Sequence, residues 1–181
     1  LHAIREVLNA EGQPLKRYPL ELDQRFSVQS TFELQYALQA VLREGTGRSV
    51  YNSFPESLQL AGKTGTTNDQ RDSWFAGFSG EHVAVVWLGK DDNSQTPLSG
   101  AAGALQIWAD LMRQLPTQGV NEQAPEGVSY DWIDSATGQL SAEQCEGALW
   151  LPLHNDFKPK ESAECHIKAS GEEHWWQKIF H

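Results

Sequence analysis

Basic residues are scarce in this sequence. The 181 residues contain 14 Lys and Arg against 24 Asp and Glu, which gives a formal net charge of -10 at pH 7. A protein that binds the phosphate backbone of DNA or RNA needs a basic surface, and this composition does not supply one. We therefore expect no nucleic-acid partner.

Long apolar runs are also absent. The longest ones, such as residues 83–88, fall far below the roughly 20 residues that a membrane-spanning helix needs. No charged and then apolar leader opens the sequence, which begins at Leu1 without methionine. We therefore expect no membrane span in these residues, and the opening suggests a piece of a longer protein.

Cysteine occurs only twice, as Cys145 and Cys165, both in the polar C-terminal third. One disulfide between them would close a loop of about 20 residues and contribute roughly 3 kcal/mol in the chain-entropy model. A segment with a weak core gains most from such a link, so we favour the disulfide over two unrelated thiols. It would indicate an oxidising compartment.

Metal-binding patterns are missing as well. His154 and His166 lie near the cysteines, but their spacing matches no common zinc finger. Four aspartates fall in predicted turns, where solvated acidic residues are common: Asp69, Asp72, Asp91 and Asp92. The sequence therefore predicts neither a metal ion nor another cofactor.

Helix signals are clear in two places. Ser30 to Glu33 has the pattern of a capping box, with apolar residues following at helical spacing until Gly45. The glycine-rich stretch GTGRSV after it is too short for a phosphate loop, so we interpret it as a connector. A second helix is predicted over residues 99–115, with Pro116 as its stop. Its apolar stripe is expected in the core: Leu105, Trp108, Leu111, Met112 and Leu115.

Three strands joined by short turns are predicted between the helices, as an antiparallel meander. They cover residues 60–67, 74–78 and 82–89. In the last of them both alternating sets of side chains are apolar, which is typical of a strand covered on both faces. We therefore expect that strand at the centre of the sheet.

The two ends of the chain leave alternatives open. Residues 1–25 fit either a helix ended by Gly12 or a β-hairpin around NAEGQ, and periodicity alone slightly favours the helix. Residues 116–126 have the composition of a linker, and a short Trp-rich appendage follows. Its segment EEHWWQKIF, residues 172–180, fits a tail packed on its own domain or a docking peptide.

The stretch Lys63-Thr64-Gly65-Thr66-Thr67 is an unusual strand. An interior glycine weakens a strand unless a ligand or another backbone must come close. We therefore interpret this strand as a ligand edge.

The residues around this strand carry a family resemblance. AGKTGTTNDQRDSWFAGF, followed by an apolar strand ending in WLGKDDN, resembles the third and fourth core strands of the transpeptidase domain of penicillin-binding proteins. The resemblance extends through VLREGTGRSV and GAAGALQIW. The tail CEGALWLPL…CHIK…WWQKIF resembles the C-terminal extension of the bifunctional (class A) members of the 1b type. The resemblance therefore covers nearly the whole chain.

The resemblance implies an α+β fold with an antiparallel sheet flanked by helices, as in penicillin-binding transpeptidases and serine β-lactamases, and a small C-terminal appendage. Residues 1–116 would form the C-terminal part of the transpeptidase domain, 117–127 a linker and 128–181 the extension. For residues 3–18 it implies a β-hairpin, against the periodicity.

The resemblance also assigns roles to the strand. Peptidoglycan stem peptides end in D-Ala-D-Ala, and these peptides and β-lactams are the implied ligands. Lys63 would supply the catalytic cation, and the Thr66 backbone N–H would donate to the oxyanion. Thr64 and Thr66 alternate onto one side of a strand and can donate to the carboxylate. Gly65 would leave room for a strand-like substrate, and Thr67 completes the substrate-binding set.

Two motifs of the family are not found. No serine here begins Ser-x-x-Lys or Ser-x-Asn, so the nucleophile of a serine acyl transfer and its activating Lys are missing. We expect half an active site, inactive by itself. The parent would carry the rest upstream, with a glycosyltransferase domain and an anchor that places it on the periplasmic side of the cytoplasmic membrane. Alternatives are a D,D-carboxypeptidase or β-lactamase relative, or a non-catalytic module whose extension binds a regulatory protein.

Overall fold

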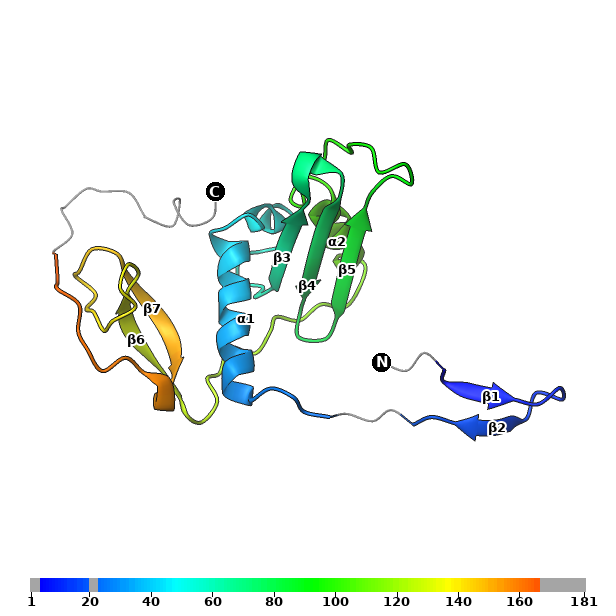
Figure 1. Ribbon diagram of the computed structural model, residues 1–181, viewed down its shortest axis with the longest axis horizontal. Coiled ribbons are helices and arrows are strands. Elements are labelled where there is room, and N and C mark those ends of the chain that lie inside the picture. The colour runs from blue at the N-terminus through cyan, green and yellow to red at the C-terminus, as the bar shows by residue number, and fades with distance from the viewer. Residues whose placement is uncertain (1–3, 20–22, 167–181) are drawn as a thin grey trace.

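The computed structural model describes residues 4–19 and 23–166. It contains helices and three separate antiparallel sheets of two, three and two strands (Figure 1). The predicted α+β class with an antiparallel sheet is therefore confirmed. None of the helices in the described ranges has the length and apolarity needed to cross a membrane.

The three-stranded sheet is the predicted meander. It consists of β3 (Ala61–Thr66), β4 (Ser73–Phe78) and β5 (Val83–Leu88), in the order β3-β4-β5. All three strands pair antiparallel and in unbroken register. The short 3-10 helix η2 (Asn68–Gln70) lies in the turn between β3 and β4.

The central position predicted for β5 is wrong. Among the described strands β4 lies in the centre and β5 forms one edge. The side chains of Val83, Val85 and Trp87 are 77%, 60% and 49% exposed, whereas the alternate set faces the core. A strand with apolar residues on both faces can be buried on both faces. Its sequence does not show whether other elements cover both of them.

Helix α2 (Ala104–Met112) packs behind the sheet in Figure 1 and covers one face. Trp108 and Met112 are fully buried, as predicted. The helix is shorter than the predicted 99–115. Its start is tied to the sheet, because Ala104 N donates to Ser73 Oγ of β4 over 3.0 Å. Leu111, expected in the core, is 43% exposed.

Helix α1 (Val28–Arg43) runs beside β3, with the 3-10 helix η1 (Arg48–Asn52) after it. Its C-terminal turn carries Val41 and Leu42 into the same core as α2. The predicted stop is confirmed, since the helix ends at Arg43 and Gly45 N donates to Val41 O.

The predicted capping box of α1 is wrong. The N-cap is Ser27, whose side chain accepts a hydrogen bond from Ser30 N over 3.0 Å. Nothing between the two serines breaks a helix, so the helix begins one turn earlier. Glu33 does not reach back, because its Oε1 accepts from His154 N over 2.6 Å.

Residues 6–17 form a β-hairpin, which confirms the implication of the resemblance over the periodicity. β1 (Glu6–Leu8) pairs antiparallel with β2 (Pro14–Arg17). The side chain of Asn9 accepts from the backbone N–H of Gln13 over 2.8 Å, and Gly12 has a φ of 77°, which an L side chain rarely adopts. Both strands are exposed, and Figure 1 shows the hairpin projecting away from the sheet.

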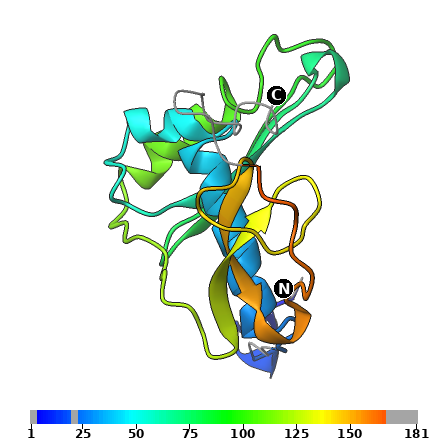
Figure 2. The same cartoon turned by 90° about the vertical axis from the view of Figure 1, so that its left-hand side faces the viewer.

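The last described residues form a small unit. β6 (Val128–Asp134) pairs antiparallel with β7 (Ala148–His154), and the 3-10 helix η3 (Asn155–Phe157) follows. A disulfide joins Cys145 to Cys165. Figure 2, viewed from the side of this unit, shows β7 in front of α1. The predicted amphipathic segment 172–180 lies outside the described residues.

Aromatic contacts fix the small unit to α1. The Tyr36 hydroxyl donates to Trp150 O over 2.8 Å, and the Tyr36 ring meets the edge of Tyr130. Tyr130 in turn stacks on Trp150. Burial at this contact raises the pKa of Tyr36, against an opposing effect of the Arg43 charge. Helix α1 therefore packs against the sheet on one side and the appendage on another.

The segment between α2 and β6 is held in place by contacts with earlier parts of the chain. Val120 is 7% exposed, and its N–H donates to Gln59 O over 2.8 Å. Arg43 of α1 forms an ion pair with Glu122 at 2.9 Å. Gln35 donates to Asn121 O over 2.6 Å. This segment therefore packs against α1 and the residues that lead into β3.

Candidate functional site

The strand that carries the motif lies at an edge of its sheet. Among the described residues, β3 pairs only with β4. Just past the strand, Thr67 N donates to Asp72 O. Because an antiparallel ladder bonds alternate residues, Thr64 and Thr66 direct their backbone N–H and C=O groups to the other side. The free edge of β3 thus carries backbone donors and acceptors that no strand in the described part of the chain pairs.

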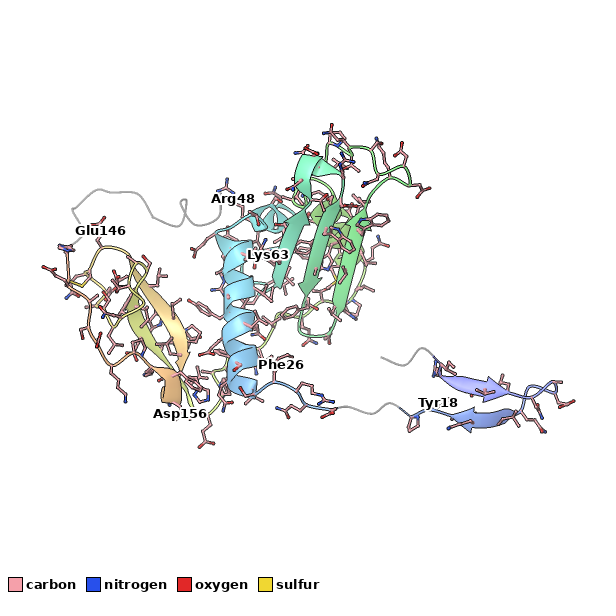
Figure 3. All side chains as sticks on the ribbon, in the orientation of Figure 1. Tyr18, Phe26, Arg48, Lys63, Glu146 and Asp156 are labelled. Carbon is pink, nitrogen blue, oxygen red and sulfur yellow. A yellow bond between two sulfur atoms is a disulfide. The ribbon has the colours of Figure 1, made fainter. Side chains whose placement is uncertain are left out.

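Lys63 lies on an exposed part of this strand. Its Nζ donates to Thr64 O over 2.7 Å, which brings the ammonium group to the free edge. Figure 3 shows Lys63 on the side of β3 that faces α1. A cation is therefore held next to the backbone groups of the edge.

The two threonines expected to act as a pair have different surroundings. Thr64 is 9% exposed, and its Oγ1 lies 2.6 Å from Oγ1 of Thr46. Thr66 is exposed, and its Oγ1 accepts from Gly100 N over 2.9 Å. Since that contact uses Thr66 as an acceptor, its hydroxyl proton stays available to a ligand.

Gly65 is enclosed by the protein's own backbone and side chains. A Cβ on Gly65 would lie 3.1 Å from Cβ of Trp74, its partner across the sheet. On the α2 side, a Cβ on Gly100 would come within 2.7 Å of Gly65 O. An interior glycine predicts that a ligand or another backbone comes close to the strand. Part of this close contact is made by the chain's own residues.

Asp72 closes the turn that follows the motif. Its Oδ2 accepts from the Thr67 hydroxyl over 3.1 Å, and its Oδ1 accepts from Trp87 Nε1 over 2.9 Å. Thr67 Oγ1 also accepts from Asp72 N over 2.8 Å. These bonds tie Thr67, the last residue of the predicted substrate-binding set, to β4 and β5.

The predicted residues 63–67 are contiguous and line one end of β3, but sequence reasoning missed three of their neighbours. These are Thr46, Asp72 and Gly100, which contact Thr64, Thr67 and Thr66. The repeated glycines around Thr46 were the one available signal, because flanking glycines indicate a backbone in close contact. In the described part of the chain no cluster of three or more His, Cys, Asp or Glu could hold a metal ion.

The sequence of the chain is similar to those of known penicillin-binding proteins. No family model matches the chain. Penicillin-binding protein 1B of Vibrio cholerae is 40% identical over 158 residues, which cover 87% of this chain and 19% of the relative. Penicillin-binding protein 1B of Haemophilus influenzae is 33% identical and that of Escherichia coli 39%, over 84% and 72% of the chain. These two alignments span 19% and 16% of the relatives.

A solved structure shows the same fold. The crystal structure of penicillin-binding protein 1A from Haemophilus influenzae superposes with a TM-score of 0.64 and 21% identity. The superposition covers 89% of this chain and 30% of that one. By these similarities the chain belongs to the class A penicillin-binding proteins and resembles their 1B type.

Proposed function

We propose that β3 is the substrate-binding half of a serine D,D-transpeptidase site, acting in peptidoglycan synthesis. The observation that carries this proposal is the free edge of β3, where Thr64 O holds Lys63 Nζ and toward which the Thr66 N–H is directed. A peptide that ends in D-Ala-D-Ala, or a β-lactam, presents a carboxylate next to a carbonyl. An extended ligand would add to this edge through main-chain hydrogen bonds.

Each group at the edge has a role in this proposal. Lys63 attracts the carboxylate and Thr66 donates its hydroxyl proton to it. Thr64 adds a second hydroxyl beside the edge. The Thr66 N–H stabilises the negative charge that develops on the attacked carbonyl oxygen. Gly65 and Thr67 keep the strand close to its neighbours, so that these donors are fixed before a ligand arrives.

The nucleophile would come from another part of the longer protein. The chain spans 19% of the length of the Vibrio and Haemophilus 1B relatives, and none of its serines is followed by Lys three positions later. In this proposal residues 1–116 complete a transpeptidase domain, 117–127 connect it, and 128–181 form the extension. The longer protein would also be a glycosyltransferase, anchored in the cytoplasmic membrane and facing the periplasm.

The proposal is tested by titrating the isotope-labelled 181-residue chain with a short peptide ending in D-Ala-D-Ala, followed by NMR. We expect the amide signals of residues 63–67 to move. Lys63→Ala should weaken binding by about tenfold, because it removes one charge-assisted hydrogen bond.

Two controls make the titration specific. The same peptide with a C-terminal amide lacks the carboxylate and should bind weakly. Lys16→Ala removes another exposed lysine, on β2, and should leave the affinity unchanged. Signals that move only on the hairpin, or no signals that move at all, would refute the proposed site.

A further inference from the structure

Thr46 lies 18 positions before Thr64, yet the two hydroxyl oxygens are only 2.6 Å apart. The motif does not include Thr46, and the sequence suggested only a connector there. We propose that Thr46 is a positioning residue: it donates its proton to Thr64 Oγ1 and so directs the proton of Thr64 toward a carboxylate bound at the free edge of β3. This inference rests on the proposed function.

The turn after α1 is built so that Thr46 reaches this position. Gly45 N and Gly47 N both donate to Val41 O over 3.1 Å, which folds the chain tightly around Thr46. A Cβ on Gly47 would lie 2.3 Å from Cδ2 of the buried Leu42. Both glycines are buried, whereas Thr46 between them is exposed. The turn therefore presents one side chain, and its hydroxyl meets Thr64.

The direction of the proton follows from counting donors. Each threonine hydroxyl has one proton and two acceptor lone pairs, so the contact between Thr46 and Thr64 uses only one of the two protons. If Thr64 donated to Thr46, it would have none left for a ligand. A carboxylate beside Thr64 favours the opposite order, in which Thr46 donates to Thr64 and Thr64 donates to the anion.

This order of donation strengthens the hydrogen bond from Thr64 to the carboxylate. In a chain of hydrogen bonds each donor polarises the next, and the effect is larger where water is excluded. Thr64 is 9% exposed, so few waters compete with Thr46 for its lone pairs. The hydroxyl of Thr46 would thus raise the affinity for a carboxylate without touching the ligand.

The test is a double-mutant cycle on the 181-residue chain, with the D-Ala-D-Ala peptide as the probe and NMR titration as the readout. Thr46→Val keeps the shape of the side chain and removes the hydroxyl, and we expect about three- to tenfold weaker binding. Thr46→Ser keeps the hydroxyl and should restore the affinity. Thr31→Val removes a hydroxyl on α1 that donates to Ser27 O, away from β3, and should change nothing.

The cycle separates positioning from a general structural effect. In a Thr64→Val background, Thr46→Val should cause no further loss, whereas a structural effect would weaken binding in both backgrounds. Thr46→Ala provides the same comparison if valine disturbs the turn. Equal affinity in the native chain and the Thr46→Val variant refutes the inference and leaves the proposed function intact. Failure of the native chain to bind the peptide refutes both.

Discussion

At the scale of single residues, the site depends on contacts between side chains that are far apart in the sequence. The stretch Lys63 to Thr67 was identifiable because its chemistry is local. Thr46 was not, because only the fold brings α1 and β3 together. Asp72 was expected to be solvated, yet its carboxylate accepts from Thr67 and Trp87. Composition and spacing locate a motif in the sequence. The residues that contact the motif in space become known only from the fold.

Gly47 provides a prediction about the turn that presents Thr46. In Gly47→Ala the new Cβ would collide with Leu42, whose side chain must then move within the core. We expect a loss of about 1–3 kcal/mol in the free energy of unfolding, measured by urea denaturation. The φ of Gly47 is -97°, which an L side chain readily adopts, so backbone strain adds nothing to this loss. An unchanged free energy of unfolding in Gly47→Ala would contradict the crowding.

Asp134 provides a prediction about pH. Hydrogen bonds from the Thr137 side chain and backbone hold the pKa of Asp134 below its ordinary value. Because the folded-state pKa is lowered, this carboxylate stabilises the fold above its ordinary pKa, and the contribution is lost as the pH falls through the folded value. In Thr137→Val the pKa of Asp134 should rise, as followed by NMR of the carboxyl carbon. An unchanged titration would exclude the Thr137 hydroxyl as the cause.

At the scale of elements, α1 connects the sheet to the appendage. The helix itself was predictable from its spacing, but its start was not, because Ser27 and Ser30 are both suitable caps. The edge position of β5 could not be predicted either, since the apolar pattern of a strand does not specify which strands lie beside it. The hairpin over residues 6–17 followed from the family resemblance, where periodicity favoured a helix.

Glu33 provides a prediction about the joint between α1 and β7. Its carboxylate accepts from His154 N over 2.6 Å in a partly buried contact, and Glu33→Ala would leave that N–H without its partner. We expect a loss of about 1–3 kcal/mol in local stability, seen as faster hydrogen exchange of the His154 amide. Glu33→Gln keeps an acceptor and should show a smaller effect. Equal exchange in all three proteins would mean that this bond does not hold the appendage.

At the scale of the whole molecule, the chain combines an open sheet edge with a small disulfide-bonded unit. The fold class followed from the sequence, and the disulfide was favoured there on general grounds. The sheet face that carries Trp74 and Val85 is exposed, whereas the apolar pattern of residues 82–89 predicted a strand covered on both faces. Any element that covers this face must come from outside the sheet. The sequence pattern of β4 and β5 does not identify that element.

The disulfide provides a prediction about redox state. Protein prepared under oxidising conditions and then denatured without reductant should show no free thiol, because Cys145 and Cys165 are the only cysteines. Addition of reductant should release two thiols per chain in a colorimetric assay. Two reactive thiols before reduction would contradict the disulfide.

We propose that this chain holds the substrate-binding half of a penicillin-binding site without its nucleophile. The most direct measurement is labelling with a fluorescent penicillin, followed by denaturation and gel analysis. We predict no covalent label on the 181-residue chain, and a label on a chain extended upstream in the same reading frame. That label should be lost in its Lys63→Ala variant. A stoichiometric, serine-linked adduct on the 181-residue chain, or full labelling of the extended chain without Lys63, would contradict this half-site.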